Sequence, residues 1–164
     1  MYKRPLVPAG LLVPTGFRHT EFTARMLSVR DLIADYDAVM SSERGLIGLL
    51  DPVSDWPVGL TLEENLIDLG WHQRKFTLRH SFAYTVMTPD QSLCLGCCYI
   101  YPSDLSDFEA VAFYWVRSSH KHLVEALGVS FRRFLAEEWP FSRVAFPGRD
   151  QPWPNPRHSR LSVD

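Results

Sequence analysis

Apolar residues change their spacing twice along this chain, and this change constrains the fold more than any other feature. Between about residues 29 and 79 they recur every three or four positions, as in helices with one buried face. From Phe82 to Val116 the period is two, which is typical of strands, and from Leu123 to Leu135 it is helical again. This pattern predicts helices packed against one sheet.

Capping patterns indicate where two helices begin. Ser28 with Asp31, and Thr61 with Glu64, have the spacing of a capping box, in which each side chain bonds the backbone N–H of the other residue. The apolar stripes that follow predict helices ending near residues 40 and 79. Between them, residues 45–59 contain two prolines and three glycines and predict a loop.

The order of the other elements predicts the sheet topology. Three successive strands form an antiparallel meander, and a helix over 123–139 then leads to one more strand, as in a right-handed parallel crossover. We therefore expect an α/β (α+β) fold with a mixed central sheet, a meander followed by a parallel β-α-β crossover, and helices on both faces. The expected strands are 21–27, 82–86, 93–101, 108–116 and 143–146.

Two proline-rich ends frame the predicted domain. A chain of 164 residues is the usual size of one domain, and we place it at residues 19–148. Residues 1–18 are expected to form an extended arm and 149–164 a tail. The tail could cover a pocket, swap onto a second subunit in a homodimer, or lack order.

Charge and cysteine content limit the classes of binding partner and the cellular compartment that we expect. The chain has 17 basic and 19 acidic residues without a basic stripe, so we expect no nucleic acid partner. The apolar stretch near the N-terminus is interrupted by prolines and is too short to span a membrane, so no membrane partner is expected either. Three cysteines, an odd number, favour a reducing compartment, and we expect the cytoplasm.

Common catalytic and metal motifs are missing from the sequence. There is neither a Gly-x-Ser-x-Gly elbow nor a Gly-Lys-Ser/Thr phosphate loop. Cys94, Cys97 and Cys98 lie in one predicted strand, where Cys94 and Cys98 should share a face and Cys97 should point to the other. One strand cannot direct all three thiols at one ion, so we expect no metal.

Two features of the sequence carry a resemblance to a known family: the order of elements over residues 19–148, and the segment from Phe113 to Ser119, a strand that leads into a helix. In both features the chain resembles the acyl-CoA-dependent acetyltransferases of the GNAT superfamily. The resemblance implies transfer of an acetyl group from acetyl-CoA to a primary amine by direct attack. It also implies that the strand splays from its neighbour, pairs with the pantetheine arm through its backbone, and leads to a helix N-terminus that holds the pyrophosphate.

The resemblance implies roles for particular residues. Glu109 is the candidate base, and the candidate acid is either water or Tyr101. The cofactor-binding candidates are Trp115, Val116, Arg117, Ser118 and Ser119. The family's usual loop contains glycines, which let the backbone approach a phosphate, whereas residues 118–123 contain none. The alternative hypothesis is therefore an inactive module of the same fold that binds a ligand or a protein.

Aromatic residues on the predicted sheet indicate where the acceptor would bind. Tyr99, with Trp71 and His72 from the second helix, could line an apolar pocket that has a few polar groups. The expected partner is a small-molecule or peptide amine, and the sequence does not select among amines.

Overall fold

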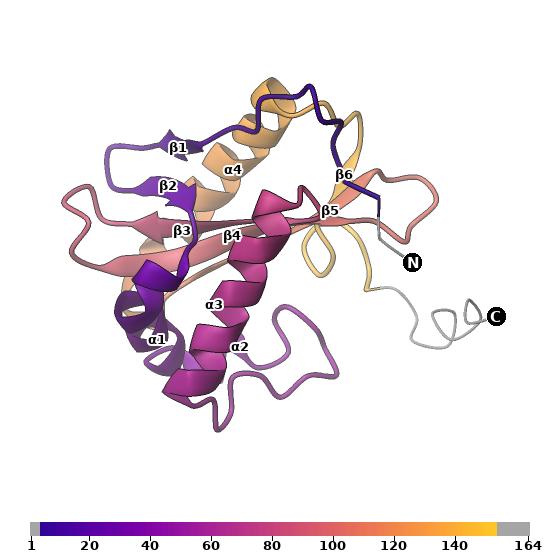
Figure 1. Cartoon of the computed structure of the whole chain (residues 1–164). Helices are drawn as coiled ribbons and strands as arrows, with labels where there is room; N and C mark the ends of the chain where they lie inside the picture. Colours follow the sequence, from indigo (N-terminus) through magenta and orange to yellow (C-terminus); the bar gives the residue numbers. More distant parts are fainter. Residues whose placement is uncertain (1–3, 154–164) are drawn as a thin grey trace.

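The computed structural model describes residues 4–153, which form a six-stranded sheet in the order β1-β2-β3-β4-β5-β6 (Figure 1). Neighbouring strands are antiparallel except β5 and β6, which are parallel. The predicted meander and parallel crossover are thus confirmed. The strands are β1 (Gly16–Arg18), β2 (Thr23–Met26), β3 (Phe82–Met87), β4 (Cys94–Pro102), β5 (Ala110–Val116) and β6 (Val144–Ala145).

Helices cover both faces of this sheet, as predicted, with α4 on one face and α1, α2 and α3 on the other (Figure 1). Both capping boxes form: Thr61 Oγ1 accepts from the Glu64 N–H at 3.1 Å, and the Thr61 N–H donates to Glu64 Oε2 at 2.9 Å. The helices are the 3₁₀ turns η1 (Val29–Asp31) and η2 (Ser118–Leu123), and α1 (Leu32–Met40), α2 (Glu43–Leu46), α3 (Leu62–Thr77) and α4 (Val124–Glu138).

The two faces carry two separate apolar cores. On one face, Leu127, Phe131 and Phe134 of α4 pack against alternate residues of the meander. On the other, Val39 of α1 and Leu69 of α3 pack against the remaining ones. This division follows from the alternation of side chains along each strand, which requires both faces of a sheet rich in apolar residues to be covered.

The N-terminal segment packs against the domain. Val7 is buried, the Leu6 N–H donates to the Arg79 carbonyl at 2.7 Å, and Arg79 donates to the Leu11 carbonyl at 2.6 Å. Strand β1 lies within the predicted arm and pairs with β2, a pairing that the apolar pattern did not predict. Of the predicted arm and tail, residues 1–3 and 154–164 lie outside the described residues.

A β-bulge changes which cysteines share a face. Val86 pairs with Gly96, but Met87 pairs with Cys94, so Leu95 is the extra residue. As a result Cys94 lies in the same core as Cys97, and Cys98 lies in the other. The prediction that Cys94 and Cys98 share a face was therefore wrong, because strict alternation ignores the inserted residue.

All three thiols are buried, and burial raises the pKa of the Cys94 thiol to about 12. Such thiols stay protonated at neutral pH.

Among residues 4–153 no helix has both the length and the apolar character needed to cross a lipid bilayer.

We expect Gly96→Ala to destabilise the fold strongly, because a Cβ atom at Gly96 would lie 1.9 Å from the Trp115 carbonyl oxygen of the adjacent strand. Overpacking against backbone should lower the free energy of unfolding by about 3 kcal/mol, measured by urea denaturation. Gly10→Ala is the matched control, since a Cβ there meets nothing within 4 Å. Equal stability of the two variants would contradict the close approach of β4 and β5.

Candidate functional site

Strand β5 has one edge that is mostly unpaired within the described chain. Its other edge pairs with β4 along its whole length, whereas β6 pairs with it only at Ala110 and Val111. Beyond these two residues the strands diverge and leave a cavity of about 240 Å³. Its lining comes from β5 (Ala112 to Tyr114), the loop after α2 (Gly48 to Leu50), and the chain after β6 (Pro147 to Arg149, with Trp153).

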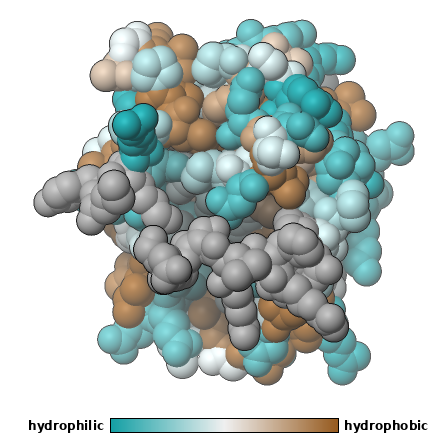
Figure 2. Space-filling view, turned by 90° about the vertical axis from the view of Figure 1, so that its right-hand side faces the viewer, coloured by the Kyte–Doolittle hydropathy of each residue, from teal (hydrophilic) through white to brown (hydrophobic). Residues whose placement is uncertain are grey.

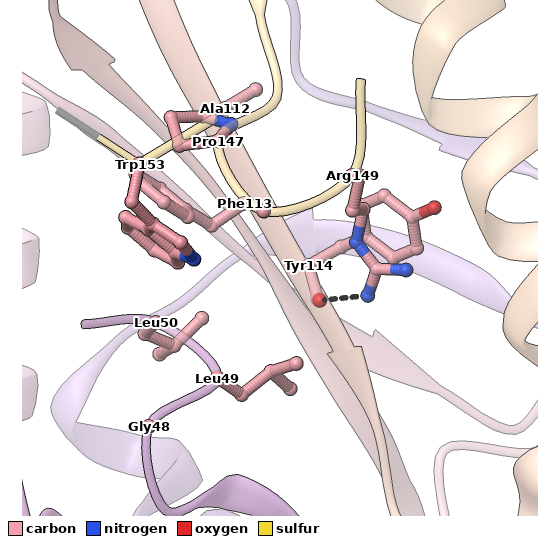
Figure 3. Close-up of a pocket in the computed structure, with 10 residues that line it drawn as sticks. Gly48, Leu49, Leu50, Ala112, Phe113, Tyr114, Pro147, Arg149 and Trp153 are labelled. Carbon is pink, nitrogen blue, oxygen red and sulfur yellow. Dashed lines mark hydrogen bonds between the residues drawn. The ribbon is translucent and has the colours of Figure 1, made fainter. Parts of the chain in front are cut away.

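Side chains from the chain after β6 lie against this strand edge (Figure 3). Arg149 Nη2 donates to the Tyr114 carbonyl at 2.9 Å, and the guanidinium lies 3.7 Å from the centre of the Tyr114 ring. Trp153 stacks on Phe113 with the ring centres 5.7 Å apart. Because carbonyls alternate in direction along a strand, those of Ala112 and Val116 point the same way as that of Tyr114.

A second cavity, of about 270 Å³, continues along the same edge toward the start of α4. Val116, Ser118 and Lys121 line it, and it shares Leu49 and Arg149 with the first. Together the two cavities follow the free backbone of β5 from the point where β6 diverges to the turn η2. Figure 2, which looks onto the right-hand side of Figure 1, shows apolar and polar residues interspersed on that face.

The predicted cofactor residue Arg117 points into the protein. Its Nε donates to Ser119 Oγ at 3.1 Å, and its Nη1 donates to the Cys94 carbonyl at 3.0 Å. Its Nη2 donates to Asp37 Oδ2 at 3.1 Å and to Ser41 Oγ at 3.2 Å. The guanidinium is buried and joins the end of β5 to α1 and to the start of β4.

The backbone of the turn η2 is also engaged. The Ser118 N–H donates to Ser42 Oγ at 2.9 Å, and the His120 N–H donates to the Arg117 carbonyl at 2.9 Å. Of the predicted cofactor residues, Val116 and Ser118 line the second cavity together with Trp115. Ser119 instead holds the Arg117 guanidinium and contacts His120.

Glu109 lies at the closed end of the divergence, next to the residues where β5 and β6 pair. Its side chain is exposed, and Glu109 Oε2 accepts from the Ser142 N–H at 2.7 Å, in the connection between α4 and β6. Glu109 does not line either cavity along β5. Its role as a base stays a prediction.

The aromatic residues predicted for the acceptor pocket do come together. The ring of His72 lies 5.4 Å from that of Tyr99, and the rings of Tyr99 and Tyr101 stack at 6.0 Å. Trp71 meets His72 edge-on from the exposed side of α3. Beyond Tyr101 the row continues to Phe113 at 5.9 Å, so it runs from α3 to the cavity at the β5 edge.

A third cavity, of about 100 Å³, lies beside this row and contains a buried carboxylate that the sequence analysis missed. Asp35 of α1 is only 4% exposed, and Asn65 Nδ2 of α3 donates to its Oδ2 at 2.9 Å. Leu32, Asp35 and Val39 are spaced as one helix face. An acidic residue within this apolar stripe is the sequence feature that could have predicted a buried carboxylate. Burial raises the pKa of the Asp35 carboxyl to about 6.

Two of the predicted site residues are also perturbed by burial in this cavity. Loss of solvent lowers the pKa of His72 to about 4, so the imidazole is neutral at pH 7. Burial likewise raises the pKa of the Tyr101 hydroxyl, which therefore stays protonated. The cavity thus combines a neutral aromatic wall with an acidic group.

Comparison with known proteins gives the fold. No protein-family model matches the sequence, and no curated protein matches it. Among solved structures, RimL, a ribosomal L7/L12 alpha-N-protein acetyltransferase in complex with coenzyme A, matches with a TM-score of 0.59 and 17% identity, over 75% of this chain and 64% of RimL. The microcin C7 self-immunity acetyltransferase MccE, in complex with acetyl-CoA and AMP, matches with a TM-score of 0.59 and 12% identity, over 76% of this chain and 68% of MccE.

A third structure, the ribosomal-protein-S5-alanine acetyltransferase from Vibrio fischeri, matches with a TM-score of 0.58 and 13% identity, over 75% of this chain and 68% of that one. This chain has the GNAT fold. The divergence of β5 and β6 is the splayed strand pair that the resemblance implied for a GNAT protein. The turn η2 lacks the glycines that the resemblance implied, and donors at this turn bond to Asp37 of α1 and to Ser42, just before α2.

We expect Arg117→Met to lower the free energy of unfolding by about 2 kcal/mol, because it removes four hydrogen bonds of a buried guanidinium. Lys121→Met removes a nearby exposed charge and should leave stability unchanged, as measured by urea denaturation. If Arg117→Met kept full stability and lost cofactor binding, the guanidinium would be a direct cofactor ligand rather than a structural one.

Proposed function

We propose that this protein is an acyl-CoA-dependent N-acyltransferase that moves an acetyl group from acetyl-CoA to an amine. The observation that carries the proposal is the free edge of β5, where residues Ala112 to Val116 border two adjacent cavities that share Leu49 and Arg149 in their linings. An unpaired strand edge accepts an extended chain containing amides through backbone hydrogen bonds, and the pantetheine arm of coenzyme A is such a chain.

The fold neighbours support the cofactor class. RimL was solved with coenzyme A and MccE with acetyl-CoA and AMP, and both have the arrangement of elements seen here. In this chain the thioester would lie near Phe113 and Tyr114, where the β5 edge meets the aromatic row. The pyrophosphate would lie in the second cavity, beside Lys121 and the Ser118 hydroxyl.

The reaction needs no nucleophile on the protein. The neutral amine nitrogen of the acceptor attacks the thioester carbonyl carbon, the C–S bond breaks, and the thiolate of coenzyme A leaves. The amine loses one proton to a base and the thiolate gains one from an acid. We propose Tyr101 as this acid, because it is protonated and lies beside Phe113. We retain Glu109 as the candidate base, reached through water from its place at the closed end.

One specific set of contacts favours a second function, a binding module without acyl transfer. The Arg117 guanidinium and the Ser118 N–H are already bonded within the protein, and Arg149 occupies the Tyr114 carbonyl. Coenzyme A would have to displace Arg149 and bind its pyrophosphate with few backbone donors. A module that binds another ligand would leave these contacts in place.

Calorimetric titration with acetyl-CoA and with coenzyme A separates the two functions. We expect saturable binding to the unaltered protein and about fivefold tighter binding to Arg149→Ala, because the pantetheine no longer competes for the Tyr114 carbonyl; fivefold corresponds to about 1 kcal/mol, one hydrogen bond. Arg133→Ala, an exposed charge on α4, is the control and should bind as the unaltered protein does.

Absence of binding to both the protein and Arg149→Ala would sink the acyltransferase proposal and leave the binding module. Weaker binding to Arg149→Ala would place the guanidinium on the cofactor rather than in its way. Where binding is found, acetyl transfer to a panel of amines, followed by release of the free thiol, tests the reaction itself.

A further inference from the structure

The cavity of about 100 Å³ beside Asp35 lies on the α1 and α3 face of the sheet, and several elements line it. Asp35 comes from α1, Asp68 and His72 from α3, Trp56 from the loop between α2 and α3, and Tyr99 from β4. At about 30 Å³ per water molecule, this volume corresponds to about three waters. A small polar head group with a short carbon chain has a similar volume.

The charged residues of this cavity are all acidic. Asp35 and Asp68 line it, and no lysine or arginine does so in the described part of the chain. The nearby Asp31 is paired with Arg25 at 2.8 Å, so its charge is compensated. For the Asp35 carboxylate the only hydrogen bond found within residues 4–153 is the neutral one from Asn65. Burying an ionised carboxylate without a cationic partner lowers the stability of the fold, unless a bound ligand supplies the compensating positive charge.

The other walls suit a cation as well. The rings of Trp56, His72, Tyr99 and Tyr101 line the cavity, and aromatic faces attract an ammonium group that lies over them. Because burial keeps His72 neutral at pH 7, it does not supply a positive charge of its own. An anion or a purely apolar ligand would leave Asp35 uncompensated.

We propose that this cavity binds a small organic ammonium ion, with the Asp35 carboxylate as its counter-ion and the aromatic residues as its walls. Leu50 lines both this cavity and the one at the β5 edge, and the aromatic row joins the two. The inference rests on the proposed function only where it names this ion, once it has lost a proton to the base, as the acceptor amine; the binding itself does not require acyl-CoA.

Nuclear magnetic resonance of the full chain tests the binding without any acyl-CoA. Trp56 lines the cavity, and Trp115 Nε1 donates to Tyr99 Oη at 3.0 Å, so both indole N–H resonances report on it. Ethylammonium chloride at pH 7.5 should shift both resonances in a saturable way, while propan-1-ol, of similar size and uncharged, should not. Equal shifts with propan-1-ol, or none with ethylammonium, would overturn the inference.

Asp35→Asn should weaken ethylammonium binding by at least about tenfold, the effect of losing one charge-assisted hydrogen bond. The raised pKa of Asp35 means that its ionised form opposes folding at neutral pH, so the neutral asparagine should fold and can still accept from Asn65. Asp107→Asn, the same change at an exposed position between β4 and β5, is the control and should bind unchanged. Undiminished binding by Asp35→Asn would overturn the inference.

A pH series on the unaltered protein gives a second test. Ethylammonium stays protonated below about pH 9, as lysine does. Binding should therefore weaken as the pH falls through about 6, where Asp35 gains its proton. Among the other groups near Asp35, His72 is neutral and Cys94, Cys97 and Tyr99 are protonated between pH 5 and 8, and Asp31 is paired with Arg25. Burial also raises the pKa of Asp68, which lines the same cavity, so the pH series is repeated on Asp35→Asn to isolate the contribution of Asp35. Binding that does not change over this range would contradict the role of Asp35.

The two proposals fail independently. Ethylammonium binding without any acetyl-CoA binding would support the cation site and count against acyl transfer. Acetyl-CoA binding without ethylammonium binding would support acyl transfer and place its acceptor elsewhere.

Discussion

The unequal pairing of β5 determines the rest of the architecture. One edge of this strand is bonded to β4 along its full length, and the other is bonded to β6 at two residues only. Pairing at two residues is enough to orient the strand after α4, yet it leaves most of this second edge of β5 unpaired. Exposed strand edges are usually covered or blunted. Here Arg149 and Trp153 lie against the edge without pairing with it as a strand.

This arrangement places two different chemical environments on the same sheet. The edge of β5 offers backbone donors and acceptors to an extended ligand, whereas the cavity beside Asp35 offers a buried carboxylate and aromatic rings. Leu50 borders both, and the row from His72 through Tyr101 to Phe113 connects them. A reaction between two substrates requires such adjacency, because the reacting atoms must be held close together while each ligand keeps its own contacts.

The turn after β5 shows how a shared fold can carry different local chemistry. Without glycines, Ser118–Leu123 form the 3₁₀ turn η2. The Ser118 N–H bonds to Ser42, and the side chain of Arg117, just before the turn, bonds to Asp37 of α1. These bonds stabilise the contact between β5 and α1, but they occupy groups that a phosphate would need. The fold is therefore common to this chain and to RimL and MccE, while the local chemistry of this turn depends on a few hydrogen bonds.

The sequence by itself determined the number of layers, the meander, the crossover and both capping boxes, because the apolar period and the caps are local properties of the chain. Only the tertiary structure decided the rest, because those features depend on residues distant in sequence. The inward turn of Arg117 depends on Asp37, 80 positions away, and the partner of Asp35 is Asn65, 30 positions away. The bulge at Leu95 depends on how β4 meets β3, and the contact of Arg149 with β5 depends on where β6 diverges. Periodicity records which face of an element is buried, but not which groups meet there.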